Sequence, residues 1–262
     1  MNDLSKWIEL VVPVRNEACA IADVLYAVRC VPELSYVHIV VVDDGSDDHT
    51  PAVLATIAAM DTLVHYLHID RANKDVALWT GAQRCSAHWI VCMDGDGQYD
   101  PGDIPGLRLQ ERSERCGAVW GVRQCRRDTR WRRMQSVNGA LIKQRMMGTL
   151  AARDPGCGLF AVRRTVFASI ANAIPNPCGQ VHCHIPELAQ AWGYHVDENA
   201  VKHYPRTAGK AKFGAANRIV SGYRSLLQAR RASLAIMRAC ANGSALQHGV
   251  AIAHTAMHAH DA

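Results

Sequence analysis

Short apolar runs alternate with segments of helical spacing between residues 7 and 93. The runs have the length and the β-branched content of buried strands, whereas the segments between them repeat apolar residues every three or four positions. Strands that are apolar almost throughout suit the interior of a parallel sheet covered on both faces. We expect strands over 7–14, 37–43, 63–69 and 89–93, and helices over 18–29, 51–60 and 76–87. This alternation predicts an α/β fold with a single doubly wound, mostly parallel sheet and right-handed crossovers.

The second half of the chain continues with shorter elements. We expect, in order, a helix over 105–116, a strand over 118–122, a helix over 134–150, a strand over 160–162, a helix over 185–192 and a turn plus strand over 193–201. A basic segment over 215–240 has the apolar spacing of an amphipathic helix. The expected organisation is one domain over 1–214, a C-terminal amphipathic helix over 215–241 and a poorly ordered tail over 242–262.

Acidic residues follow directly on two of the expected strands. Asp43 and Asp44 end the second strand, and Asp94 and Asp96 follow the fourth. Residues two apart in an extended segment point the same way, so Asp94 and Asp96 present two carboxylates to one spot and repel each other unless a cation intervenes. Ligands of doubly wound sheets bind beyond the carboxyl ends of the strands. Hard oxygen atoms suit Mg²⁺ or Mn²⁺ shared with the phosphates of a substrate.

Other interpretations of the possible ligand residues carry less weight. An acidic turn, in which Asp and Gly satisfy only turn geometry, explains the same stretch. A calcium loop fits poorly, because Tyr99 and Pro105 stand where it needs glycine and glutamate. The ten cysteines are scattered without a CxxC pair, which is typical of reduced thiols. One further group matches no zinc-site spacing: Cys178, His182, Cys183 and His184.

The net charge of +5 is unevenly distributed. Six arginines and one acid lie between Arg123 and Arg133, and no Asp or Glu occurs from Lys202 to His260. Such blocks are solvated faces or anion contacts, and nucleic acid is disfavoured because aromatic residues are scarce there and no known motif occurs. The chain start lacks a signal-peptide pattern, and no apolar run reaches the roughly 18 residues that span a bilayer. We therefore expect a cytoplasmic protein, either soluble or peripheral on the membrane.

Five motifs, in this order, resemble those of family-2 glycosyltransferases with the glycosyltransferase-A fold. More closely, they are similar to the branch that makes polyprenyl-phosphate sugars, typified by dolichol-phosphate mannose synthase. The resemblance covers roughly residues 8–218 and rests on the segments 12–17, 42–50, 93–105, 154–164 and 203–218. It implies a Rossmann-like catalytic domain over residues 1–214.

The resemblance also implies roles for individual residues. A nucleotide-sugar donor, UDP- or GDP-linked, would be held by Pro13, Arg15, Glu17, Asp43, Asp44, Arg206 and Lys212. The catalytic carboxylates and the ligands of Mg²⁺ or Mn²⁺ would be Asp94, Asp96 and Gln98. The phosphate of a polyprenyl phosphate acceptor would be held by Arg123, Arg132, Arg133 and Ser136.

The chemistry of an inverting, metal-assisted sugar transfer agrees with these roles. A departing nucleoside diphosphate needs cations to stabilise its growing charge. A phosphate monoester acceptor is already anionic at neutral pH, so arginines position it and no base is required. Departures from the family pattern occur at Arg15, at 73–75, at Phe160 and at Cys183. They leave open a transfer to a soluble hydroxyl, or a degenerate nucleotide-sugar or lipid sensor. The basic helix either contacts an anionic membrane or packs on the domain.

Overall fold

A seven-stranded sheet forms the centre of the protein in the computed structural model, which describes residues 3–70, 73–124, 141–205 and 215–241. Its strands are β1 (Ile8–Val14), β2 (Ile39–Asp44), β3 (Val64–Ile69), β4 (Trp89–Cys92), β5 (Cys116–Arg123), β6 (Phe160–Arg163) and β7 (His195–Val201). They lie in the order β3-β2-β1-β4-β6-β5-β7. Only β6 runs antiparallel to its neighbours within this sheet. The predicted doubly wound, mostly parallel sheet is confirmed.

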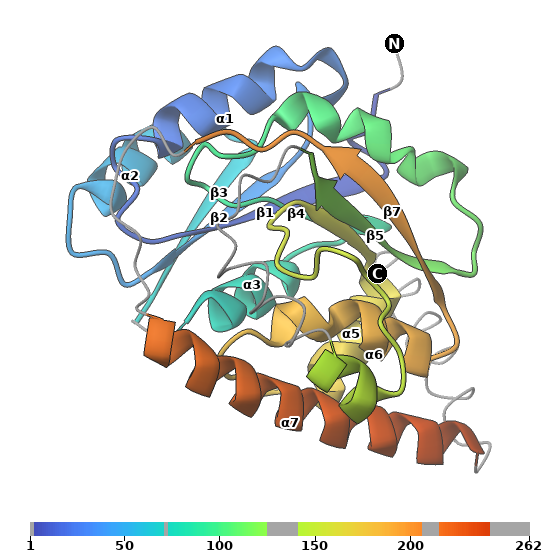
Figure 1. Ribbon diagram of the computed structural model, residues 1–262. Helices are drawn as coiled ribbons and strands as arrows, with labels where there is room; N and C mark the ends of the chain where they lie inside the picture. The colour runs from blue at the N-terminus through green and yellow to red at the C-terminus, as the bar shows by residue number, and fades with distance from the viewer. Residues whose placement is uncertain (1–2, 71–72, 125–140, 206–214, 242–262) are drawn as a thin grey trace, which may run out of the picture.

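Helices cover both faces of the sheet (Figure 1). They are α1 (Ile21–Cys30), α2 (Thr50–Met60), α3 (Lys74–Ala82), α5 (Arg164–Ala173), α6 (Ile185–Ala191) and α7 (Ala215–Ala241), and residues 141–147 are also helical. Short 3₁₀ turns occur at η1 (Pro32–Leu34), η2 (Pro101–Asp103), η3 (Pro105–Leu107), η4 (Leu109–Glu111) and η5 (Val181–His184). Helices α1 and α2 lie on one face, whereas α3, α5 and α6 lie on the other, with α7 outside them.

The apolar strands lie inside the sheet and are covered on both faces, as their composition predicted. Every residue of β2 and β4 is buried, because both strands have a neighbour on each side and helices above and below. Large aromatic residues extend this core toward β5 and β6, where the rings of Trp120 and Phe160 stack with centroids 4.1 Å apart. Such pairs contribute about 1 kcal/mol beyond their buried area. The core therefore fixes the positions of the strand ends.

One expectation about secondary structure was wrong, and one helix was not predicted. The segment 105–116 forms the turns η3 and η4 instead of a helix, because Arg108 adopts a left-handed conformation (φ 52°) and the Arg112 side chain donates to Leu107 O at 3.0 Å. The resulting strand β5 begins earlier than expected. Helix α5 was missed, although its buried residues Val166 and Ile170 have helical spacing. Part of the helix expected over 134–150 is present at 141–147, and 134–140 lies outside the described residues.

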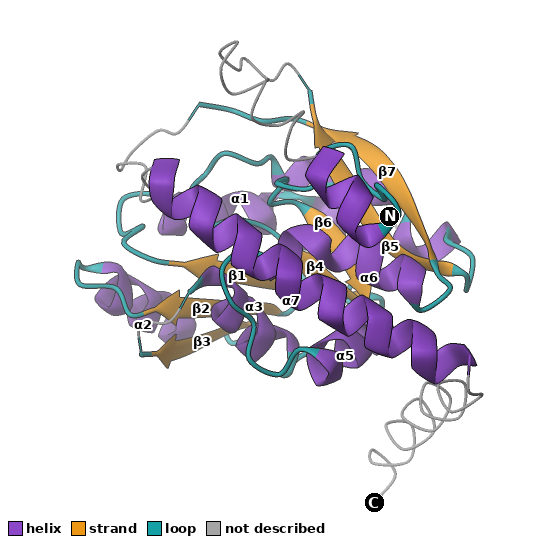
Figure 2. Ribbon diagram, turned by 60° about the horizontal axis from the view of Figure 1, so that its bottom comes forward, coloured by secondary structure: helices purple, strands orange, loops and turns teal. Residues whose placement is uncertain are grey.

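Helix α7 packs along the α5–α6 side of the domain (Figure 2). Its inner face includes Ser225, whose hydroxyl lies 3.2 Å from His184 Nε2, and Gln228, which bonds the backbone of Cys178 and Asn176. The expected amphipathic helix therefore does pack on the domain. Its outer side keeps exposed apolar and basic residues: Val220, Tyr223, Arg224, Arg230, Arg231, Leu234, Met237 and Arg238. In the described part of the chain, no helix is both long and apolar enough to cross a membrane.

Candidate active site

Most of the described candidate residues gather at one edge of the sheet. Strands β2, β4, β5 and β7 are mutually parallel, so their carboxyl ends lie at the same edge, where Asp43, Asp94 and Arg123 emerge. The chain changes winding direction between β1 and β4, the place where doubly wound sheets bind ligands. Because β1 separates β2 from β4, the two acidic strand ends are about 10 Å apart. This carboxyl edge is the candidate active site.

The turn after β4 carries the carboxylates of Asp94 and Asp96, and two glycines allow its tight backbone path. A Cβ on Gly95 would lie 2.5 Å from Val14 Cγ1, so only glycine allows the turn to approach β1 this closely. Gly97 has a φ of +74°, a conformation that favours glycine. Asp96 is buried and accepts the Gln98 N–H at 3.1 Å. The Gln98 side chain instead donates to Tyr204 O at 3.0 Å, so it faces the segment after β7.

Asp94 lies in contact with a lysine to which the sequence assigned no role. The Lys74 ammonium forms an ion pair with Asp94 Oδ1. Burial disfavours the charged ammonium, but Asp94 holds the pKa of Lys74 above its usual value. Lys74 is the first residue of α3, and Asn73 caps that helix by accepting from the N–H groups of Asp75 and Val76. An asparagine cap before a helical run was the available signal for this position.

The loop before β6 closes over the other side of Asp94. A Cβ on Gly158 would lie 2.5 Å from Asp94 Cγ and nearer still to Oδ2, so glycine is required for this contact. The Gly158 N–H donates to the Tyr99 hydroxyl at 2.7 Å, and burial raises the pKa of Tyr99. The ring of Tyr99 packs edge-on against His203, with centroids 5.2 Å apart. Lys74 at the start of α3 and Gly158 before β6 therefore flank the Asp94 carboxylate, and Tyr99 and His203 lie behind Gly158.

Arg123 reaches the same edge but is already paired. Its Nε and Nη2 atoms donate to the two carboxylate oxygens of Asp154 at 2.7 and 2.8 Å. Burial opposes the charged form of Arg123, yet the Asp154 bonds hold its pKa above the usual value. Burial and Arg123 together lower the pKa of His203, which favours a neutral imidazole beside the carboxylates. Asp154 thus fixes where the arginine points.

The loops after β1 and β2 are joined by hydrogen bonds. Asp43 is fully buried and accepts from Ser46 N at 3.0 Å and from His68 Nδ1 at 3.0 Å. Asn16, with a φ of +51°, donates its N–H to the Ser46 hydroxyl at 2.8 Å. Glu17 and Asp44 are also buried here, Pro13 is half-buried, and the half-buried Arg15 has an Nε atom without a hydrogen-bond partner among the described residues. The residues on these loops that were predicted to bind the nucleotide-sugar donor therefore lie beside one another.

The remaining predicted site residues lie outside the described part of the chain. Their roles stay predictions: Arg132, Arg133, Ser136, Arg206 and Lys212.

The donor set at Asp94 and Asp96 fits a divalent cation. Both groups are hard carboxylate oxygens, and an amide side chain follows at Gln98, which is the ligand chemistry of Mg²⁺ and Mn²⁺. The ammonium of Lys74 already contacts Asp94, which shows that this position favours positive charge. A metal ion would have to share Asp94 with Lys74 or displace it.

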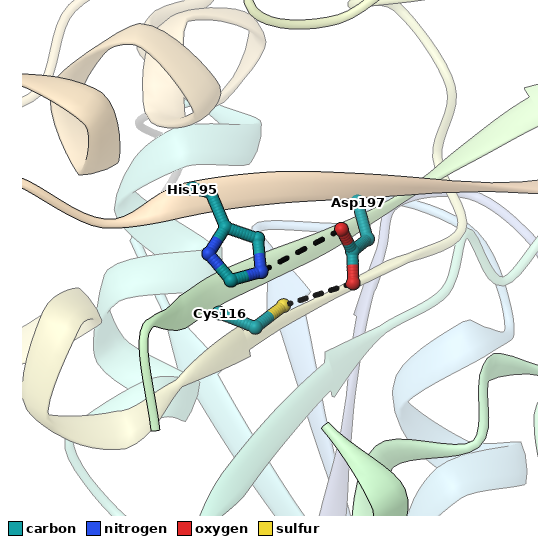
Figure 3. Close-up of side chains that lie close together, drawn as sticks. All are labelled: Cys116, His195 and Asp197. Atoms are coloured by element: carbon teal, nitrogen blue, oxygen red, sulfur yellow. Dashed lines mark hydrogen bonds and ion pairs between the residues drawn. The ribbon is translucent and has the colours of Figure 1, made fainter. Parts of the chain in front are cut away.

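A second group of metal-type ligands lies at the opposite, amino edge of the sheet (Figure 3). Cys116 and His195 begin β5 and β7, and the Cys116 thiol lies 3.5 Å from Asp197 Oδ2. The same carboxylate oxygen accepts from Arg112 at 2.8 Å. Burial and Asp197 raise the pKa of Cys116 to about 11, so the thiol keeps its proton at neutral pH, whereas metals bind the thiolate.

The disfavoured zinc group does not bring three ligands together among the described residues, although Cys183 Sγ lies 3.5 Å from His182 Nε2. His182 Nδ1 contacts Asp75, and His184 Nε2 bonds Ser225 on another helix.

Comparison with known proteins agrees with this architecture. Crystal structures of glucosyl-3-phosphoglycerate synthase from Mycobacterium tuberculosis share the fold. The complex of that protein with Mn²⁺, UDP-glucose and phosphoglyceric acid is 20% identical, with a TM-score of 0.62 over 86% of this chain and 80% of the other. The chain belongs to glycosyl transferase family 2, whose sequence profile matches residues 9–170.

Curated relatives are closer in sequence. The undecaprenyl-phosphate 4-deoxy-4-formamido-L-arabinose transferase of Pseudomonas syringae pv. syringae is 32% identical over 213 residues, covering 79% of this chain and 61% of the relative. The protein of the same name from Pseudomonas paraeruginosa is 32% identical over 212 residues, covering 79% of this chain and 60% of the relative. The chain thus spans less than two thirds of the length of these relatives.

Proposed function

We propose that the chain is an inverting glycosyltransferase that moves a sugar from a UDP- or GDP-sugar to a polyprenyl phosphate. The observation that carries the proposal is the carboxylate pair Asp94 and Asp96 at the switch point of the sheet, with Lys74 in contact with the first of them. The names of the curated relatives support an isoprenoid phosphate as the acceptor. The branch expected from the five motifs agrees with those names.

The donor would lie along the ends of β1, β2 and β4. Asp43, held by Ser46 and His68, and the neighbouring Asp44 would accept from the ribose or base, with Pro13, Arg15 and Glu17 beside them. A divalent ion held by Asp94, Asp96 and Gln98 would neutralise charge on the departing diphosphate. Lys74 would then exchange Asp94 for a diphosphate oxygen and supply a further preorganised cation. Arg206 and Lys212 are proposed to contact the same diphosphate.

The acceptor phosphate would be positioned near Arg123. Because Arg123 shares its charge with Asp154, it is a weaker phosphate ligand than an unpaired arginine, but its orientation is fixed. A phosphate acceptor therefore needs further cations, and Arg132, Arg133 and Ser136 are the proposed additional ligands. No base is required, since the acceptor phosphate oxygen is already charged. Holding that oxygen close to the anomeric carbon of the donor sugar would promote its attack.

The outer side of α7 is proposed to lie on an anionic membrane surface. Its exposed arginines, including Arg224 and Arg231, alternate with exposed apolar side chains such as Tyr223 and Met237. A basic face with interspersed apolar residues binds anionic lipid through charge attraction and shallow insertion. Such a contact would place the candidate active site close to a lipid-linked acceptor.

A lipid-extraction assay tests the proposal. The protein is incubated with Mn²⁺ or Mg²⁺, radiolabelled UDP- and GDP-sugars in turn, and a short polyprenyl phosphate. Transfer of label into the organic phase, abolished by a chelator, is the expected result and identifies the donor. Label transferred only to water-soluble acceptors would overturn the lipid acceptor while keeping the donor site. Absence of both donor binding and turnover would favour a degenerate sensor.

A further inference from the structure

The segment before α6 aligns a cysteine, a histidine and a buried carboxylate. Cys183 Sγ lies 3.5 Å from His182 Nε2, and the other ring nitrogen, Nδ1, contacts Asp75 Oδ1. Asp75 is fully buried and also accepts the backbone N–H groups of Val181 at 2.7 Å and His182 at 3.2 Å. A carboxylate only accepts, so Nδ1 carries a proton toward Asp75 and the ring orientation is fixed. Nε2 is thereby aimed at the sulfur.

Two cationic side chains lie near Cys183, and each is also paired with a carboxylate, His182 with Asp75 and Lys143 with Glu187. Burial opposes protonation of His182, but Cys183 and Asp75 raise its pKa to about 10, so the ring is an imidazolium at neutral pH. The Lys143 ammonium donates to the Cys183 carbonyl at 2.8 Å while it pairs with Glu187. Positive donors beside a cysteine favour its thiolate, which is the nucleophilic form.

Access separates Cys183 from most of the other cysteines. Among the described cysteines four are buried, Cys19, Cys30 and Cys240 are exposed, and Cys178 and Cys183 are half-buried. Cys183 combines this partial exposure with an oriented imidazole, an arrangement that Cys178 and the exposed cysteines do not share in the described contacts. Selective cysteine oxidation follows these two properties together.

We propose that Cys183 is a nucleophilic thiol that small hydroperoxides oxidise to a sulfenic acid, with His182 as proton donor and Asp75 as its positioning residue. The sulfur attacks the terminal peroxide oxygen, so an S–O bond forms and the O–O bond breaks. Sulfur loses two electrons and the peroxide gains them. The departing alkoxide or hydroxide takes the proton from His182 Nε2, and the products are the sulfenic acid and an alcohol or water.

The experiment treats the intact protein with hydrogen peroxide and dimedone at neutral pH and measures labelling of each cysteine peptide by mass spectrometry. Cys19 and Cys240 serve as exposed reference thiols within the same molecule. We expect initial labelling of Cys183 to be about tenfold faster than that of either reference, because the oriented His182 ring places a proton donor beside the sulfur. In urea-unfolded protein the three rates should converge. Equal rates in the folded protein would overturn the proposal.

A His182→Asn variant assigns the effect to the imidazole. Labelling of Cys183 should fall to the reference rate, while Cys19 and Cys240 keep their wild-type rates and circular dichroism confirms the fold. Fast labelling retained in this variant would contradict the role of His182. If the variant does not fold, the comparison of folded and urea-unfolded wild-type protein still decides whether Cys183 is activated. None of these readouts depends on sugar transfer.

Discussion

The two edges of the sheet carry similar residue types but differ in how their carboxylates are neutralised. At the amino edge, the Arg112 side chain donates to Asp197, to Asn199 Oδ1 at 2.9 Å and twice to Leu107 O. At the carboxyl edge, Asp94 contacts Lys74, and the Lys74 ammonium forms no other hydrogen bond or ion pair with the described residues. One cation is fixed by four hydrogen bonds, and the other is held by one ion pair at the end of a flexible side chain.

This difference separates a structural cluster from a site that accepts ligands. A carboxylate paired with a firmly held cation attracts a metal ion less, and the protonated Cys116 thiol beside it is a poor ligand. A carboxylate whose cation can move away can exchange it for a metal or release it to a diphosphate. Proximity of possible metal ligands therefore identifies a functional site only together with their charge balance.

The largest expected effect comes from removing a carboxylate at each edge. Asp96→Ala should lower sugar transfer by about 10³-fold, because it removes a ligand of the metal that stabilises the leaving diphosphate. Asp197→Ala is the matched control: transfer should change little, and the free energy of unfolding should fall by about 1 kcal/mol. Initial-rate assays and urea unfolding measure both variants. Similar losses of transfer in the two variants would remove the functional distinction between the edges.

Two crowded glycines provide the next contrast. In Gly158→Ala the new Cβ collides with the Asp94 carboxylate, so transfer should fall by about 10- to 100-fold through displacement of that group. In Gly117→Ala the Cβ would lie 2.6 Å from Tyr194 Cβ, and we expect a stability loss of about 1–3 kcal/mol with the turnover of folded protein retained. The turnover rate divided by the concentration of folded protein, which thermal melts determine, distinguishes the two variants. Normal turnover of Gly158→Ala would mean that Asp94 need not stay in place.

A smaller effect, on the affinity for Mn²⁺, is expected to distinguish Lys74 from Arg112. Lys74→Met should tighten Mn²⁺ binding to the donor-free protein by about tenfold, because the metal no longer competes with an ammonium for Asp94. Arg112→Met should leave Mn²⁺ binding unchanged and cost about 2 kcal/mol of stability, since three partly buried acceptors, Asp197, Asn199 and Leu107 O, lose their donor. Calorimetric titration of Mn²⁺ into each variant checks this. Weaker binding in Lys74→Met would show that the lysine supports the metal.

The smallest effect is a pH dependence of the amino edge. The folded pKa of Cys116 is raised to about 11 from 9.0, so stability from the neutral thiol is fully present below pH 9 and is lost as the pH rises toward 11. The free energy of unfolding should therefore decline more steeply over this interval in wild type than in Cys116→Ala. Urea titrations at pH 8, 9, 10 and 11 measure the two slopes. Identical slopes would mean that Asp197 and burial do not raise the pKa of the Cys116 thiol in the folded protein.

Local patterns were sufficient to predict the sheet and the edge at which its acidic strand ends lie. Apolar runs of strand length gave the parallel strands, and acids directly after a run, such as Asp43 and Asp94, are placed by that strand alone. Lys74, Tyr99 and Asp154 were assigned no role, because their importance arises from contacts between distant segments. The Gly158–Tyr99 bond, for example, joins residues 59 positions apart.

The wrong prediction over 105–116 has a tertiary origin. That segment contains helix-compatible residues, but the Arg112–Leu107 bond and the left-handed Arg108 select tight turns once β7 supplies Asn199 and Asp197. Tertiary contacts outweighed propensity there. Helix α5 was missed for another reason, because the helical spacing of Val166, Phe167 and Ile170 was present in the sequence but was not used.

The most direct test of the account is to locate a bound metal. Crystals grown with Mn²⁺ and a nucleoside diphosphate, UDP and GDP in turn, would be measured at a wavelength where Mn²⁺ scatters anomalously. The account predicts a peak beside Asp94 and Asp96 with the diphosphate in contact, the Lys74 ammonium moved from Asp94, and no peak at Cys116, His195 and Asp197. A peak at the amino edge, or a nucleotide bound with Lys74 still paired to Asp94 and no metal, would contradict it.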